Sequence, residues 1–207
     1  AAGGALPNRG QSATLLALLL VPGDGLVVAP NDCYGGTYRL IRGLEEQGRL
    51  RAAFVDMKDE DALADALAQG PALVWIETPS NPLLRIADIA AISARAKAAG
   101  ALTLADNTLL TPCRQKPLEF GCDLVLHSTS KAINGHGDAF GGALLAKHAA
   151  LVERLRWWAN AAGLSASPQA AWQTLRGLRT LPLRLDRQEE SAIAIAKRLR
   201  EGPQIQG

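Results

Sequence analysis

Short runs of apolar residues, each followed at once by a polar cluster, recur along the chain up to residue 146. The runs are continuous and rich in Val, Leu and Ala, which is typical of strands buried on both faces of a parallel sheet. The pattern predicts strands at residues 25–30, 52–55, 73–76, 102–105, 124–126 and 142–146. Because the polar clusters follow their strands at the same end, we expect their side chains to converge at one edge of the sheet, where open α/β sheets bind ligands.

Longer amphipathic or alanine-rich segments alternate with these strands and predict helices. We expect helices at residues 14–20, 40–47, 59–69, 86–99, 149–162, 167–176 and 180–200, and a loop over residues 1–10. Alternation of strand and helix is the pattern of an α/β protein, in which helices cover both faces of a mostly parallel sheet. The predicted fold class is therefore α/β, with three layers in the order α/β/α.

The polar clusters carry an unusual set of side chains for binding a flat, anionic molecule. They offer an aromatic ring at Tyr34, an amide at Asn81, a carboxylate at Asp106 and an amine at Lys131. Hydroxyl groups at Thr108, Ser128 and Ser130 and a helix start at Gly10 and Gln11 add possible anion ligands. A glycine at a helix start leaves backbone N–H groups free for an anion, and the helix dipole favours a phosphate there. A plain helix cap explains Gly10 equally well, and a tyrosine buried on a turn explains Tyr34.

Lys131 decides whether these side chains form a binding site or have only structural roles. It lies in a turn between two predicted strands, and a buried lysine is costly unless something neutralises or uses its charge. One such use is a Schiff base with an aldehyde cofactor. A solvated loop lysine is the commoner case in an arbitrary protein, but the neighbouring clusters favour the first interpretation. The whole set suits pyridoxal phosphate (PLP), with the amine on the aldehyde, a carboxylate on the pyridine nitrogen and tyrosine against the ring.

Composition and charge narrow the class of protein. A chain of 207 residues with 48% hydrophobic and 20% charged residues is typical of a globular domain in water. The net charge of +2 gives no argument for nucleic acid or an anionic membrane surface. The longest apolar run, residues 15–21, is too short to span a bilayer, which takes about 20 apolar residues. We therefore expect no nucleic-acid partner and no membrane partner.

Cysteine and histidine usage argues against a metal site. The three cysteines, Cys33, Cys113 and Cys122, are odd in number and lack metal-ligand spacing, which favours a reducing cytoplasm. His127 and His136 flank Lys131, but no second pair of ligands accompanies them. We expect no bound metal.

Several motifs, taken in their order along the chain, resemble one known family. They are DCYGGT at residues 32–37, ETPSNP at 77–82, DNT at 106–108, STSK at 128–131 and NGH at 134–136. The chain resembles the Cys/Met-metabolism PLP-dependent enzymes of fold type I, which include cystathionine γ-synthase, cystathionine γ-lyase, methionine γ-lyase and O-acetylhomoserine sulfhydrylase. Segments 33–36, 117–121, 157–160 and 175–181 look most like the bacterial cystathionine γ-synthases. The resemblance runs from about residue 10 onward.

The resemblance implies a role for each matching residue. Lys131 would form the Schiff base with PLP and move protons, and Tyr34 would stack on the ring and assist in proton transfer. Asp106 would pair with the pyridine nitrogen, and Asn81 would bond the phenolic oxygen. The phosphate and its surroundings would be held by Gly10, Gln11, Thr108, Ser128 and Ser130. Arg39 would contact the distal carboxylate of the substrate.

The implied reaction is γ-replacement, in which an activated homoserine ester and cysteine are joined to cystathionine. Two alternatives remain open: a cystathionine or methionine γ-lyase, and a truncated or decayed family member without catalysis. The family also implies a homotetramer in the cytoplasm, with amino acids as substrates.

The domain division expected from the resemblance departs from the family pattern. Residues 1–180 would form the PLP-binding large domain without the family's N-terminal arm. Residues 181–207 would begin a long helix that leads to a C-terminal domain not found in the chain. Arg9 and Ala132 differ from the residues usual at these positions in the family. Without the partners of that helix, we expect an exposed apolar stripe at Leu181, Leu183, Ile193 and Ile195.

Overall fold

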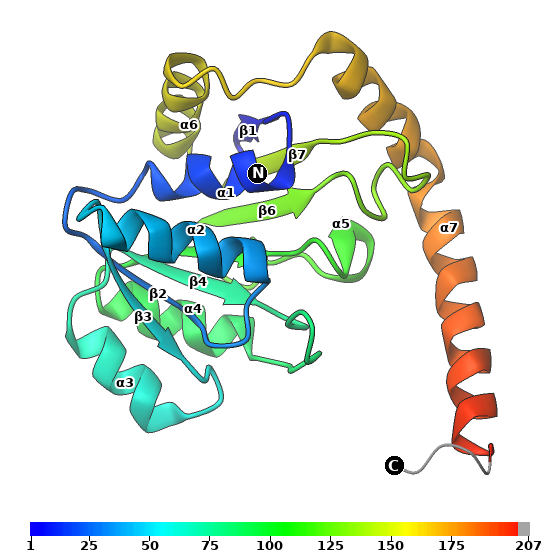
Figure 1. The fold of residues 1–207 in the computed structure, drawn as a ribbon, viewed down its shortest axis with the longest axis horizontal. Coiled ribbons are helices and arrows are strands. Elements are labelled where there is room, and N and C mark those ends of the chain that lie inside the picture. Colours follow the sequence, from blue (N-terminus) through cyan, green and yellow to red (C-terminus); the bar gives the residue numbers. More distant parts are fainter. Residues whose placement is uncertain (203–207) are drawn as a thin grey trace.

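The structure, a computed structural model, describes residues 1–202, and residues 203–207 lie outside the described part. The described residues form three layers around a seven-stranded sheet in the order β1-β7-β6-β5-β4-β2-β3 (Figure 1). The strands are β1 (Gly3–Ala5), β2 (Leu26–Pro30), β3 (Arg51–Val55), β4 (Leu73–Glu77), β5 (Leu102–Asp106), β6 (Leu124–Ser128) and β7 (Gly142–Ala146). Strands β2 to β6 run parallel to one another, and β7 is antiparallel to both of its neighbours, β6 and β1. The predicted α/β/α fold with a mostly parallel sheet is confirmed.

Helices cover both faces of the sheet, as the continuous apolar strands require. One face packs against α1 (Gly10–Leu18), α2 (Gly35–Glu46) and α6 (Ala149–Ala161), and the other against α3 (Glu60–Ala68) and α4 (Ile89–Ala98). Strand β4 supplies both cores, because Leu73 and Trp75 belong to the first and Val74 and Ile76 to the second. All four side chains are almost fully buried, so a polar residue at any of them would cost stability.

Capping residues set where two of the helices begin. Asp59 accepts hydrogen bonds from the backbone N–H groups of Asp61 and Ala62, at 3.1 and 2.9 Å, at the start of α3. Asp88 accepts one from the N–H of Ala91 at 3.0 Å, so α4 begins at Ile89 and not at residue 86 as predicted. An acidic N-cap satisfies N–H groups that have no partner inside the helix.

The first ten residues differ from the predicted loop, because β1 pairs antiparallel with β7. Gly3 and Gly4 have low strand propensity, so the local sequence gives no strand signal. A Cβ on Gly4 would lie 2.3 Å from the carbonyl oxygen of Leu144 and 3.0 Å from the Cα of Leu145. The absence of a side chain therefore lets this segment approach β7 closely, and the contact with β7 creates the strand.

The C-terminal helices also differ from the prediction. A single helix, α7 (Pro168–Arg200), replaces the two expected at 167–176 and 180–200, and it extends away from the sheet along one side (Figure 1). Gly177 lies at the expected break, yet a Cβ there would be 2.4 Å from the carbonyl oxygen of Ile133. This glycine thus serves close packing rather than a turn. The domain boundary expected at residue 180 falls inside α7 and stays a prediction. The last residues of the expected second segment, 203–207, lie outside the described part.

The exposure expected for the apolar residues of α7 is found in part, although Ile193 and Ile195, two positions apart on a helix, lie on different faces and form no single stripe. Leu183, Ile193 and Ile195 are 72%, 49% and 59% exposed. The prediction is wrong for Leu181, which is only 1% exposed because it packs with Ile133 of the turn after β6. Within residues 1–202, no helix combines the length and the apolar character needed to cross a membrane.

Gly177→Ala should lower the free energy of unfolding by about 1–3 kcal/mol, because the new methyl group meets backbone atoms of the turn that follows Lys131. Gly43→Ala in α2 is a matched control, since a Cβ there meets nothing within 4 Å. That control should gain about 0.5–1 kcal/mol from helix propensity. Urea unfolding of both variants measures the difference. Equal stabilisation by the two substitutions would contradict the packing described for Gly177.

Candidate active site

The four residues expected to share an edge of the sheet do so. Tyr34 follows β2, Asn81 follows β4, Asp106 ends β5 and Lys131 follows β6. The carboxyl ends of these parallel strands meet at one edge, with Glu77 of β4 directly beside Asp106 of β5 in register. The fold therefore gathers side chains from four separate segments, as predicted from the alternation of strands and polar clusters.

The start of α1 lies against the end of β6. A Cβ on Gly10 would be 2.8 Å from both the Cβ and the Oγ of Ser128, so only a glycine fits there without a shift. Arg9 occupies the N-cap position and has no acceptor to cap the first N–H groups of α1. The N–H of Ser128 donates to Oγ1 of Thr108 at 2.8 Å. Three of the predicted phosphate ligands, Gly10, Thr108 and Ser128, are thus brought together.

Tyr34 and Gln11 meet over Gly36. Tyr34 is the residue directly before α2, and it is 43% exposed. A Cβ on Gly36 would be 2.5 Å from Cε1 of Tyr34 and 2.9 Å from Nε2 of Gln11. Gly36 therefore makes room for the tyrosine ring and for the amide of Gln11. Exposed Arg39 lies close by, since a Cβ on Gly35 would be 3.4 Å from its guanidinium.

Asp106 is held by the segment that follows it. Its Oδ1 accepts a hydrogen bond from the N–H of Thr108 at 3.0 Å. Burial raises the pKa of Asp106, while the hydrogen bonds from Thr108 lower it. Thr108 also accepts from Ser128, so one threonine connects the carboxylate at the end of β5 with the end of β6.

Glu77 is a residue of the site to which the sequence pattern assigns no role. Its carboxylate is 7% exposed and accepts two backbone hydrogen bonds, from Tyr34 N–H at 2.9 Å and from Asn81 N–H at 2.9 Å. Burial and the charge of Asp106 raise the pKa of Glu77 to about 7. The available signal in the sequence is a carboxylate that directly continues the apolar strand of residues 73–76, where burial forces it to find partners.

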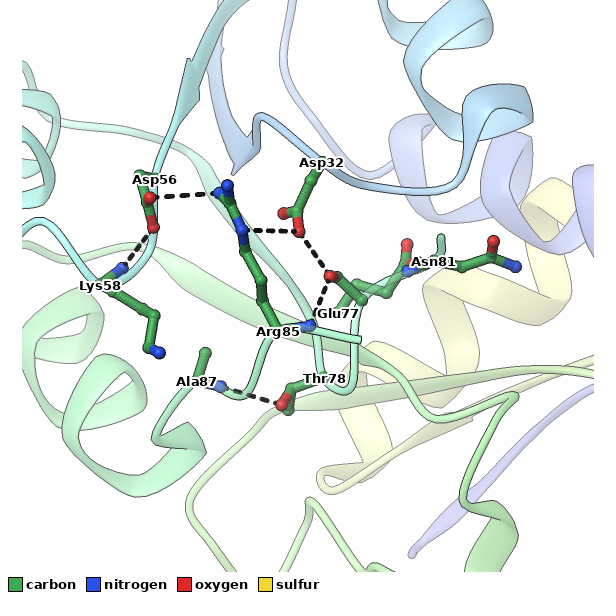
Figure 2. Close-up of polar contacts among 9 residues, drawn as sticks. Asp32, Asp56, Lys58, Glu77, Thr78, Asn81, Arg85 and Ala87 are labelled. Carbon is green, nitrogen blue, oxygen red and sulfur yellow. Dashed lines mark hydrogen bonds and ion pairs between the residues drawn. The ribbon is translucent and has the colours of Figure 1, made fainter. Parts of the chain in front are cut away.

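Asn81 is carried by a loop that several polar side chains tie down (Figure 2). The hydroxyl of Ser80 donates to Asp32 and accepts from the N–H of Arg85, and Arg85 pairs with Asp56 at 3.2 Å. Asn81 lies in a turn, and the peptide bonds before both prolines of the motif, Pro79 and Pro82, are cis. The side chain of Asn81 points away from the Asp32–Arg85 contacts (Figure 2).

Lys131 lies in the turn between β6 and β7, as predicted, but its side chain is exposed and not buried. The turn curls on itself, with Asn134 N–H donating to the carbonyl of Thr129 at 2.9 Å and Gly135 N–H to that of Lys131 at 2.8 Å. Ser130 is used within the turn, because its hydroxyl bonds the N–H and the carbonyl of Gly141 at 3.0 and 3.2 Å.

Arg184 of α7 is a second residue to which the sequence pattern assigns no role. Its guanidinium donates to the carbonyl oxygens of Ala132 and Ile133, the two residues after Lys131, and to that of Gly177 at 2.7 Å. A Cβ on Gly135 would collide with this guanidinium. The turn that carries the lysine is therefore held from α7.

His127 precedes Ser128 on β6 and is only 3% exposed. Burial lowers the pKa of His127 to about 4, so the imidazole is neutral at pH 7. Within residues 1–202, no group of three or more His, Cys, Asp or Glu side chains is arranged to hold a metal ion.

Comparison with known proteins gives consistent results. The signature of the family described as Cys/Met metabolism PLP-dependent enzyme matches residues 1–207. Cystathionine γ-synthase of Escherichia coli K12 is 48% identical over 206 residues, which is 99% of this chain and 53% of the relative. The crystal structure of cystathionine γ-synthase from Xanthomonas oryzae pv. oryzae in complex with cystathionine matches with a TM-score of 0.96 and 51% identity, over 99% of this chain and 53% of that one. For cystathionine γ-lyase from Micromonospora echinospora the TM-score is 0.95 and the identity 38%, over 99% and 54%. The chain spans about half the length of the relatives it matches.

His127 should make stability fall in mild acid. Its pKa is about 4 in the folded chain and 6.5 in the ordinary state, so the unfolded chain takes up a proton first as the pH falls. The contribution of neutral His127 to the free energy of unfolding is fully present above pH 6.5. It is lost as the pH falls toward 4, by up to about 3 kcal/mol. Urea unfolding of His127→Gln across this range should show a smaller loss than the unmodified chain. Exposed His148 provides the control substitution, His148→Gln, because its side chain lies outside the core.

Proposed function

Because the chain belongs to the Cys/Met metabolism PLP-dependent enzyme family, we propose that it carries the cofactor-binding part of a γ-replacement enzyme. The reaction would join an activated homoserine ester and cysteine. The observation that carries the proposal is the meeting of Tyr34, Asp106 and Lys131 at one edge of the sheet, beside the start of α1. The greater identity to the γ-synthases than to the γ-lyase favours replacement.

The residues at this edge fit pyridoxal phosphate. Gly10 leaves room for a close approach between the α1 start and Ser128, so N–H groups of the helix and a hydroxyl face the same space. Such a combination suits a phosphate. The half-exposed ring of Tyr34 offers a stacking surface, and the Asp106 carboxylate is available for a pyridine nitrogen.

PLP supplies an electron-withdrawing ring when it is bound, and the protein residues orient it and move protons. In the proposal, the amine of Lys131 would hold the cofactor through its aldehyde carbon, with loss of water, and its Nζ would carry protons once the amine of the substrate has taken its place at that carbon. The Tyr34 hydroxyl assists that transfer, and the Asp106 carboxylate keeps a proton on the pyridine nitrogen. Asn81 bonds the phenolic oxygen, and Arg39 binds the distal carboxylate of the substrate. The phosphate is assigned to Gly10, Gln11, Thr108, Ser128 and Ser130.

Two alternatives are kept because specific observations bear on them. A γ-lyase is kept because a cystathionine γ-lyase from Micromonospora echinospora shares the fold of this chain at a TM-score of 0.95, although its identity of 38% is below that of the γ-synthases. A member without catalysis is favoured by Arg9 and Ala132, which depart from the family pattern. Assays for cystathionine formation from a homoserine ester and cysteine, and for 2-oxo acid release from cystathionine, separate the three.

Assembly, location and domain division complete the proposal. We assign the chain to a homotetramer in the cytoplasm, with residues 1–180 as the PLP-binding domain and residues 181–207 as the start of the connecting helix. The exposed Leu183, Ile193 and Ile195 on α7 support an assembly role for that helix. The free cysteines Cys33, Cys113 and Cys122 fit a reducing compartment.

An absorbance titration tests the cofactor assignment. Addition of pyridoxal phosphate should produce the visible band of the lysine-bound cofactor, and Lys131→Ala should abolish it. Asp106→Ala should weaken the band, since the pyridine nitrogen loses its anionic partner. Lys147→Ala is the matched control: Lys147 follows β7 at the other end of the sheet and should leave the band intact. A colourless wild-type chain, or a band that survives in Lys131→Ala, would refute the assignment.

The exposed apolar side chains of α7 should drive association of the chain. Sedimentation velocity is expected to show species larger than a monomer, and replacement of Leu183 and Ile195 by Glu should shift the distribution toward smaller species. The reason is the loss of apolar surface that would otherwise be buried on contact. A clean monomer that binds no hydrophobic dye would count against this prediction.

A further inference from the structure

We propose that Glu77 is a positioning residue for the cofactor ring, which fixes the stacking tyrosine and the Asn81 loop relative to each other from beneath. This inference rests on the proposed function, because Tyr34 and Asn81 matter here as groups that contact pyridoxal phosphate. Glu77 itself lies in the sheet and acts through its neighbours.

The geometry gives Glu77 one contact to each side of the site. Its Oε2 accepts from the N–H of Tyr34 at 2.9 Å, and its Oε1 accepts from the N–H of Asn81 at 2.9 Å. Tyr34 and Asn81 belong to loops after β2 and β4, which are 47 positions apart along the chain. A single carboxylate at the end of β4 therefore sets the spacing between the backbone of Tyr34, which carries the ring, and the backbone of Asn81, which carries the amide.

A carboxylate suits this position better than its amide analogue. Two backbone donors converge on it, and a carboxylate offers an acceptor oxygen to each of them. A glutamine would offer one oxygen and would turn its NH₂ group toward the second donor, which leaves a buried N–H without a partner. Tyr34 and Asn81 would then no longer be held by the same group.

The charges around Glu77 make this carboxylate costly to keep. Asp106 lies beside it on β5 and Asp32 lies in the segment after β2, and the charges of both disfavour a further negative charge on Glu77. Arg85 is engaged with Asp32 and Asp56. Burial and the neighbouring acids raise the pKa of Glu77 to about 7. A group retained at such a cost is typical of a functional site, and its two backbone bonds show what it does there.

Glu77→Gln tests the inference, with Asp123→Asn as the matched control. Asp123 also accepts hydrogen bonds from a neighbouring strand, from N–H and Oγ1 of Thr103 at 2.9 Å each, but at the start of β6, far along the strand from the site. Absorbance titration gives the dissociation constant of pyridoxal phosphate, and visible circular dichroism reports how firmly the ring is held. Both are measured at pH 8 and pH 6 for the two variants and the wild type.

We expect Glu77→Gln to raise the dissociation constant about tenfold at pH 8 and to weaken the dichroic band, the effect of losing roughly one charge-assisted hydrogen bond. The ratio to wild type should shrink at pH 6, because wild-type Glu77 then carries a proton as well. Asp123→Asn should match the wild type in affinity and in dichroism at both pH values. A loss of stability in Glu77→Gln alone would not bring its dissociation constant closer to that of the wild type at pH 6.

A measurement without cofactor separates this inference from the proposed function. Amide hydrogen exchange of Tyr34 and Asn81 should be protected in the wild type at pH 8 and faster in Glu77→Gln, with no change in Asp123→Asn. Far-ultraviolet dichroism checks folding, and if Glu77→Gln is unfolded, Glu77→Asp, which is too short to reach both donors, decides in its place. Unchanged protection of both amides, or unchanged cofactor affinity in a folded variant, would overturn the inference. A wild-type chain that binds no pyridoxal phosphate but shows the exchange effect would refute the proposed function and leave the positioning of the two loops standing.

Discussion

Two backbone N–H groups from separate loops donate to one buried carboxylate, and the candidate site depends on that arrangement. Glu77 ends the interior strand β4, whose side chains fill the cores on both faces of the sheet, so its backbone is held by the packed part of the fold. Tyr34 and Asn81 are fixed to it through their backbones, and Asp106 lies directly beside it. The rigid layer thus extends to the loops that carry the chemistry, which is how a preorganised site is built on flexible segments.

Most of the sheet could be predicted from the sequence, because a strand buried on both faces needs an unbroken apolar run and polar residues mark where it ends. The exceptions arise where a contact between distant segments overrides the local signal. Strand β1 is made of Gly3, Gly4 and Ala5 and exists only through β7. The short helix α5 (Thr111–Arg114) was likewise not predicted, and α7 runs through Gly177 because that glycine packs against the lysine turn. Such pairings cannot be read from periodicity.

The candidate site shows the same division. Its side chains with distinctive chemistry, Tyr34, Asp106 and Lys131, could be found from motifs that end strands. The pattern assigns no role to Glu77 and Arg184, because their partners are backbone atoms; Tyr34, which donates to Glu77, and the residues bonded by Arg184 after Lys131 are remote in sequence. The burial expected for Lys131 was wrong for a related reason: exposure depends on which segments cover the edge of the sheet, and strand pattern alone does not specify that. Its role in holding the cofactor stays a prediction.

The lysine turn and α7 form one packed unit, and this bears on where the cofactor-binding part of the chain ends. Leu181 and Leu185 bury Ile133, and Arg184 bonds the two carbonyl groups that follow Lys131. A boundary at residue 180 would separate these three residues from the turn they hold. The packing continues along α7, because Arg114 of α5 pairs with Asp186 and Glu189 at 2.6 and 2.8 Å, so this part of the helix packs with the cofactor-binding part of the chain. A shift of α7 would be transmitted to the turn of Lys131 through the bonds of Arg184 and through the packing of Leu181 and Leu185 on Ile133.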